Sequence, residues 1–217
     1  MTRDIRPLFL QTAEACVALV SDDAVSRAWD DASALDGMTC GDLASHLARA
    51  VLLVEHYLDA PPPAGSPPPA GSPLDAAGYF AGFDALDADL AAGVRRRARA
   101  ESAPGHAELV GRVTAALERL RVRLPGEPAE RTVAVFEGAV MTLDEYLRTR
   151  LVELCVHADD LAAGLTFDSG PAALSAAALA DATATLVEIA VRRHGRTAVL
   201  RALTRRERDE VSALRVF

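Results

Sequence analysis

Lysine is absent from the 217 residues, so all 23 basic side chains are arginines, and asparagine is absent too. This usage is typical of a GC-rich genome and indicates no particular chemistry. Aromatic residues make up only 5% of the chain, and the dominance of alanine and leucine favours helices over sheets. The net charge of −8 argues against nucleic acid and against an anionic membrane as partners.

Long apolar runs and paired cysteines are also missing. No stretch approaches the roughly 18 apolar residues that a membrane span requires, and no signal-peptide pattern opens the chain, so we expect a cytoplasmic location. Cys16, Cys40 and Cys155 show no paired spacing, which argues against a disulfide framework. In a reducing compartment they are expected to act as small buried hydrophobic residues.

The apolar periodicity predicts an all-α protein. The expected helices cover residues 4–20, 39–60, 74–100, 108–121, 142–165, 171–193 and 196–210. We expect residues 21–37 to form a loop, the tandem PPPAGS repeat at 61–72 a surface loop, and residues 124–141 an extended connection without a sheet. This pattern predicts an antiparallel four-helix bundle over 1–165, with a helical extension over 166–217 packed on the same domain.

The expected helix Thr142–Leu165 has a line of polar side chains in addition to those of its solvent face. Thr142 and Glu145 form a capping-box pattern, a leucine-rich stripe provides a core face, and charged residues mark a solvent face. A third line of polar side chains falls within roughly 80° on the inward side. Its members are Tyr146, Arg150, Glu153, His157 and Asp160. Because burying such groups unpaired costs several kcal/mol, this line indicates a site.

Glu153 and His157 are four residues apart, so both side chains can reach one point above the same helical turn. On the expected helix 39–60, His46 points towards the apolar face, whereas Arg49 and His56 belong to the polar side. Two imidazoles and one carboxylate suit zinc with an open fourth position, and they also suit ferrous iron. The alternatives are a core histidine at 46 and a buried polar pair in which Arg150 bridges to Glu153.

The segments GDLASHLARA and TLDEYLRTRLVELCVHADDL resemble the two signature segments of the mycothiol-dependent maleylpyruvate isomerase family, whose metal-binding domain is a DinB-like four-helix bundle. The resemblance extends over most of residues 1–165. It implies that His46, Glu153 and His157 bind a divalent metal, zinc in that family. It also implies that mycothiol, the low-molecular-weight thiol of actinobacteria, is held as a thiolate that attacks a small electrophile. The implied reaction is that of an isomerase or an S-transferase.

Helical position suggests three supporting residues. Arg150, a candidate catalytic residue, is placed to orient Glu153 or to neutralise an anionic substrate, and Asp42 and Asp160 are placed to hold imidazole N–H groups. Two other function classes stay open: a binding module without turnover, and a structural or regulatory bundle with a vestigial site. The expected partners are a small thiol and an electrophilic substrate, and a homodimer is compatible with such bundles.

Overall fold

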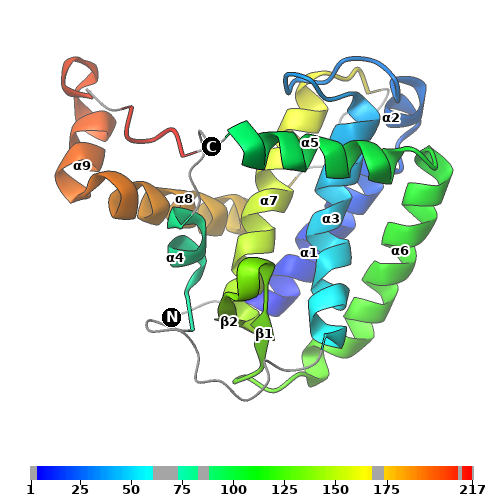
Figure 1. Ribbon diagram of the computed structural model, residues 1–217, viewed down its shortest axis with the longest axis horizontal. Helices are drawn as coiled ribbons and strands as arrows, with labels where there is room; N and C mark the ends of the chain where they lie inside the picture. Colours follow the sequence, from blue (N-terminus) through cyan, green and yellow to red (C-terminus); the bar gives the residue numbers. More distant parts are fainter. Residues whose placement is uncertain (1–3, 61–72, 83–87, 168–173, 210–211, 217) are drawn as a thin grey trace.

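The computed structural model describes residues 4–60, 73–82, 88–167, 174–209 and 212–216 (Figure 1). Four long helices form a bundle: α1 (Ile5–Val20), α3 (Cys40–Asp59), α6 (His106–Arg123) and α7 (Leu143–Ala163). The bundle interior is filled by leucines of α3 and α7 that are fully buried, among them Leu43, Leu47, Leu147, Leu151 and Leu154. The predicted all-α, DinB-like bundle is confirmed.

Helix α1 runs parallel to α7. Near the start of both helices, Arg6 Nε donates to Asp144 Oδ1 at 2.7 Å. Farther along both, Cys16 Sγ lies 3.7 Å from the Leu154 carbonyl oxygen. Contacts at matching positions along both helices establish the parallel direction.

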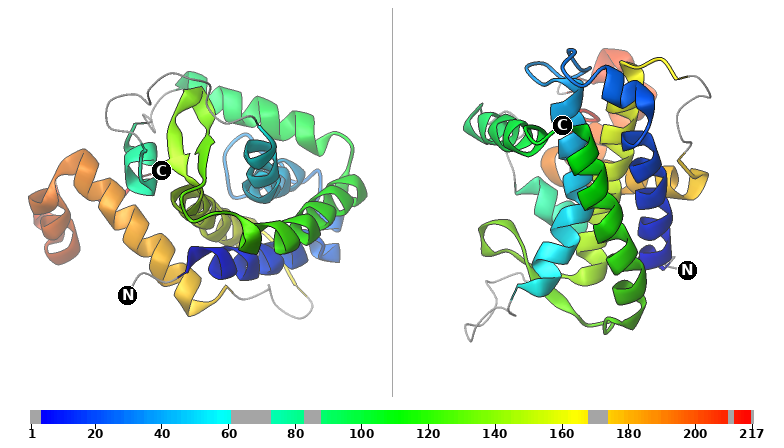
Figure 2. Two further views of the ribbon diagram at one scale, coloured as in Figure 1. Left: turned by 90° about the horizontal axis from the view of Figure 1, so that it is seen from below. Right: turned by 90° about the vertical axis from the view of Figure 1, so that its right-hand side faces the viewer.

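Helices α3 and α6 both run opposite to α7 and α1 (Figures 1 and 2). Tyr57 near the end of α3 packs against Tyr146 near the start of α7, with ring centroids 5.4 Å apart. His106 at the start of α6 bonds the carbonyl of Val20 at the end of α1, at 2.7 Å. In chain order the directions are up, down, down, up, so α3 and α7 are antiparallel neighbours.

The helix starts follow the capping signals in the sequence. Thr39 accepts from the backbone N–H of Asp42, and the Asp42 carboxylate accepts from the N–H of Thr39, which completes a capping box. At α7, Thr142 accepts from the N–H of Glu145. The Glu145 carboxylate instead accepts from the N–H of Ala76 at 2.8 Å, so only half of the predicted capping box forms there.

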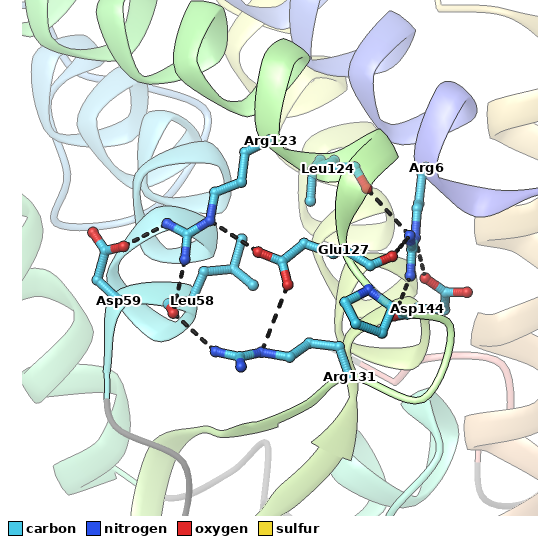
Figure 3. Close-up of polar contacts among 9 residues, drawn as sticks. Arg6, Leu58, Asp59, Arg123, Leu124, Glu127, Arg131 and Asp144 are labelled. Atoms are coloured by element: carbon cyan, nitrogen blue, oxygen red, sulfur yellow. Dashed lines mark hydrogen bonds and ion pairs between the residues drawn. The ribbon is translucent and has the colours of Figure 1, made fainter.

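Arginines close the lower end of the bundle (Figure 3). Arg6 of α1 donates to the Leu124 carbonyl at 3.2 Å as well as to Asp144 at the start of α7. Arg123 of α6 donates to the Leu58 carbonyl near the end of α3 at 2.9 Å. These bonds satisfy carbonyls that the ends of α3 and α6 leave without an intrahelical partner, and they tie all four helices together.

Two predicted segments differ in the structure. The predicted loop 21–37 contains a short helix, α2 (Asp23–Arg27), capped by Asp22. The prediction of one continuous helix over 74–100 was wrong, because the chain forms two helices there, α4 (Ala76–Ala81) and α5 (Ala88–Ser102). They pack on different partners: α4 lies against α7 and α8, whereas α5 crosses α3 (Figure 1). One straight helix cannot meet both surfaces.

The expectation of a connection without a sheet was also wrong. Strands β1 (Thr132–Ala134) and β2 (Val140–Thr142) pair antiparallel, and β2 leads directly into α7. Their turn is a 3-10 helical segment, η2 (Phe136–Gly138), and Gly138 has φ +76°, a conformation that glycine adopts without steric cost. Leu74 extends the pairing, since its N–H donates to the Val140 carbonyl at 2.9 Å. The hairpin is therefore supported by tertiary contacts.

The C-terminal part consists of α8 (Ala176–His194), α9 (Arg196–Thr204) and the short η3 (Arg206–Arg208). Helix α8 packs on α7, α4 and α1, and α9 lies farther from the bundle (Figure 1). Arg148 of α7 and Asp181 of α8 form an ion pair at 2.6 Å. The PPPAGS repeat lies outside the described residues. None of the described helices combines the length and the apolar character that a membrane span requires.

Candidate metal centre

Three potential metal ligands meet between α3 and α7. One donor atom each from His46, Glu153 and His157 lies within 4.8 Å of the other two. His157 Nε2 is 3.1 Å from Glu153 Oε2, and His46 Nε2 is 3.9 Å from the same oxygen. The three side chains are only 16–19% exposed. In the described part of the chain, no other group of three such residues comes together.

The antiparallel packing of α3 and α7 produces this convergence. The His46 and His157 rings pack in a T-shaped, edge-to-face arrangement, with centroids 4.6 Å apart. On α7, the four-residue spacing brings His157 over Glu153, as the sequence predicts. The structure therefore brings together all three residues that helical facing had singled out.

Asp160 occupies the position expected of a supporting residue. Its Oδ2 is 3.0 Å from His157 Nδ1, so the carboxylate orients the ring from the side opposite Glu153. A histidine that ligates a metal through one nitrogen commonly donates its other N–H to a carboxylate in this way. The contact leaves Nε2 directed at Glu153 and at the space between the helices.

Asp42 has a different role from the one expected. Besides completing the cap of α3, its Oδ1 accepts from Ser102 Oγ at the end of α5, at 2.7 Å. Its hydrogen bonds in the described structure thus go to Thr39 and Ser102, not to an imidazole. Asp42 is therefore committed to the start of α3, where its place three residues after Thr39 also indicates a capping role.

The protonation states of the cluster follow from burial and mutual contact. Burial alone would raise the pKa of Glu153, but the hydrogen bond from His157 and the charge of Arg150 outweigh it and hold the pKa at about 2. Burial would lower the pKa of His157, yet hydrogen bonds to Asp160 and Glu153 raise it to about 9. Burial and the nearby His157 lower the pKa of His46 to about 4. At neutral pH the carboxylate is ionised and His46 is neutral.

Arg150 lies beside the cluster without forming a hydrogen bond to Glu153. Its Nη2 is 3.9 Å from Glu153 Oε1, and its Nε donates to Thr149 Oγ1 at 3.0 Å. Its guanidinium carbon stands 5.0 Å from the centroid of the Tyr146 ring, a cation–π contact. The alternative of a buried polar pair thus has support in the structure: Arg150 forms an ion pair with Glu153 at 3.9 Å, and His157 lies beside that carboxylate.

A cavity of about 390 Å³ opens over the cluster, a size that suits a small organic ligand. All three donor residues line it, and so does Arg150. The remaining lining is mainly aromatic and aliphatic, with three further arginines. It comprises Arg49, Ala50, Leu53, Tyr57, Tyr79, Phe80, Val94, Arg97, Phe136, Tyr146, Arg193 and Val216.

Most of this lining was missed at the sequence level. Arg49 was assigned to the solvent side, but α5 covers it and Glu101 pairs with it. Ala50, Leu53 and Tyr57 line the cavity and share the helix face of His46, as helical facing indicates. No local signal points to Arg193 and Val216, which reach the cavity from the C-terminal part of the chain.

The residues present fit a divalent cation. Two imidazoles and a carboxylate form a three-ligand set that leaves a coordination position open, and all three line the cavity from which a ligand would approach. At neutral pH Glu153 is ionised and His46 is neutral, as ligation requires, and the Asp160 carboxylate supports His157. His157, whose pKa is raised to about 9, must lose one proton when a metal binds.

Residues 9–162 match the family model described as mycothiol maleylpyruvate isomerase N-terminal domain, a DinB-like family. No curated protein and no solved structure matched the chain. The family match covers more than half of the chain and includes α3, α7 and all three residues of the cluster. The chain belongs to the mycothiol maleylpyruvate isomerase N-terminal domain family.

Proposed function

We propose that the protein is a zinc-dependent enzyme that uses mycothiol as its thiol and transfers or adds it to a small electrophile. The observation that carries the proposal is the convergence of His46, Glu153 and His157 at the wall of a cavity sized for a small ligand. Membership of a mycothiol-related family supports the identity of the thiol.

A bound zinc ion would act as a Lewis acid that holds a small thiol as its thiolate at neutral pH. His46, Glu153 and His157 are the residues that would hold it. Asp160 keeps the His157 ring in place through Nδ1. The aromatic and aliphatic part of the lining would give the bound thiolate a largely apolar surrounding on that side.

The protein's own cysteines are poorly suited to serve as the nucleophile. All three are buried, and none lines the cavity. Burial raises the pKa of Cys155 to about 12 and that of Cys16 still higher, and only the thiolate is strongly nucleophilic. The attacking sulfur is therefore supplied by a small molecule.

The proposed chemistry has two variants that share the first step. The thiolate forms a carbon–sulfur bond with the electrophile. In a transferase, a leaving group departs with the electron pair and the conjugate is released. In an isomerase, addition to a cis double bond permits rotation, and elimination then restores the double bond and returns the thiol. The proposal places the reaction in the cytoplasm; homodimerisation stays a prediction.

The test is conjugation of mycothiol to monobromobimane, followed as the rate above the uncatalysed reaction. We expect acceleration by the wild type and its loss in Glu153→Gln. The matched control is Glu118→Gln, because Glu118 is 60% exposed on α6. Stoichiometric metal without acceleration would favour the binding module, and a chain that retains no metal would favour the vestigial bundle.

A further inference from the structure

Aromatic side chains are concentrated in the wall of the cavity above the metal cluster. All three tyrosines of the chain line it, and so do two of the six phenylalanines. They are Tyr57, Tyr79, Phe80, Phe136 and Tyr146. Aromatic residues make up only 5% of the sequence, so this wall is strongly enriched in them. The thiol chemistry proposed above uses none of these rings.

The rings extend the cavity away from the metal cluster. Helices α3 and α7 bring His46 against His157 at one place, and Tyr57 against Tyr146 at another, with centroids 5.4 Å apart. From residue 46 to 57 on α3, and from 157 back to 146 on α7, a rise of about 1.5 Å per residue separates the two pairs by about 16 Å. Both pairs line the cavity. It therefore has potential metal ligands at one end and aromatic rings at the other.

Three of the rings keep surface that a ligand can cover. Tyr57 and Tyr79 are half-buried, and Phe136 is 39% exposed at the turn of the hairpin. Phe136 is the most exposed phenylalanine, tyrosine or tryptophan among the described residues. Removing such apolar surface from water is favourable. The cavity thus offers a ligand an aromatic wall that the core of the protein leaves open.

Part of this wall is fixed by contacts between separate segments. The Glu145 carboxylate of α7 accepts from the Ala76 N–H at the start of α4, at 2.8 Å. Arg193 of α8 donates to the Phe80 carbonyl near the end of α4, at 2.7 Å. Helix α4, which carries Tyr79, is therefore tied to both α7 and α8 (Figure 1). A wall that is ordered in advance loses less conformational freedom when a ligand binds.

Rings of this kind favour an aromatic ligand over a saturated one of similar size. Aromatic pairs gain energy from edge-to-face and offset-stacked contacts beyond the effect of buried area. The ring contacts already present in the wall have an edge-to-face geometry, with interplanar angles of 89° for Tyr57 and Tyr146 and 70° for Tyr79 and Phe80. A planar ring that enters the cavity can extend this pattern.

We propose that Tyr57, Tyr79 and Phe136 form a binding site for an aromatic ring of the electrophilic substrate. The substrate would then lie along the cavity, with its ring at the tyrosine end and its reactive carbon towards His46, Glu153 and His157. The assignment of the ligand as the electrophile rests on the proposed function. Binding of an aromatic ring does not depend on turnover and can be measured separately.

The experiment compares 4-fluorobenzamide with its saturated counterpart, 4-fluorocyclohexanecarboxamide, which has the same polar group and a similar size. Binding to the metal-loaded protein is followed by fluorine NMR without mycothiol. We expect the wild type to bind the aromatic amide about three- to tenfold more tightly, and Phe136→Leu and Tyr57→Leu each to lower this preference at least about twofold. Phe167→Leu is the matched control, because Phe167 is half-buried outside the cavity.

The wild-type measurement is repeated with saturating mycothiol. An aromatic preference that persists with mycothiol and falls in Phe136→Leu supports the site. A failed mycothiol assay beside this result would refute the proposed function and the naming of the ligand as the electrophile, but not the aromatic site.

The proposal is overturned if neither amide binds, if both bind equally, or if Phe136→Leu keeps the full preference. It is also overturned if mycothiol displaces the aromatic amide, because the rings would then hold the thiol. Should Tyr57→Leu fail to fold, Phe136→Leu decides alone, since the Phe136 side chain is exposed and not part of the core.

Discussion

The His46 ring on α3 meets the His157 ring on α7 edge to face, with centroids 4.6 Å apart. This contact joins two parts of the chain that are distant in sequence but antiparallel neighbours in the bundle. It brings one imidazole from each helix to the same carboxylate, Glu153.

Loss of His46 should abolish metal retention. Removing one of three ligands leaves two donors on a single helix, which is too few for tight binding. We expect His46→Ala to bind metal at least about 100-fold more weakly, a loss of about 2.8 kcal/mol. His56→Ala serves as the control, because His56 lies on the same helix but is exposed. Elemental analysis measures the metal content of both variants. Full metal occupancy in His46→Ala would rule out this ligand set.

Asp160→Asn should weaken metal binding about 10- to 100-fold without abolishing it. The amide can no longer accept from His157 as a charged group, so the ring loses its charge-assisted support. The neighbouring Asp159 is exposed, and Asp159→Asn should leave the metal affinity unchanged. Chelator competition measures both variants. Equal effects of the two substitutions would indicate general electrostatics instead of support of His157.

Metal affinity should change tenfold per pH unit between about pH 5 and 9. The pKa of His157 is raised to about 9 in the metal-free protein, so one proton must leave before this nitrogen can bind metal. The pKa of His46, about 4, and that of Glu153, about 2, lie below this range. Affinity should therefore fall as the pH falls, with a slope of one proton. Chelator competition at several pH values checks it, and a pH-independent affinity would contradict the His157 assignment.

Gly41→Ala should destabilise the fold where α3 begins. A Cβ at this position would come within 2.5 Å of the Trp29 ring, and overpacking of this kind costs about 1–3 kcal/mol. Gly111→Ala on α6 is the control, because nothing lies within 4 Å of its added Cβ. That variant should gain about 0.4–1 kcal/mol. Urea unfolding measures both, and a neutral Gly41→Ala would show that the Trp29 ring moves aside freely.

The candidate ligands could be predicted because facing is a local property of a helix. Periodicity within α3 and α7 was sufficient to show that His46, Glu153 and His157 point inward. The capping-box pattern of Thr142 and Glu145 marked where α7 begins, although only Thr142 caps the helix. Asp42 of α3 bonds to Thr39 and also to Ser102, the second of which its helical position did not indicate.

The hairpin, the break between α4 and α5 and the C-terminal lining of the cavity depend on tertiary contacts, which a local sequence pattern does not indicate. The hairpin holds only three residue pairs, and Leu74 from a distant segment supports it. The predicted helix 74–100 divides because α4 and α5 pack on different surfaces. Arg193 and Val216 reach the cavity only through the packing of the C-terminal part. These features follow from the assembled fold.

The most direct measurement of the central claim is the visible and near-ultraviolet spectrum of the cobalt-substituted protein during titration with mycothiol. Cobalt bound by His46, Glu153 and His157 should develop a thiolate-to-metal charge-transfer band as mycothiol is added, and His46→Ala should show neither bound cobalt nor the band. A wild type that binds cobalt but whose spectrum does not change at saturating mycothiol would contradict the account.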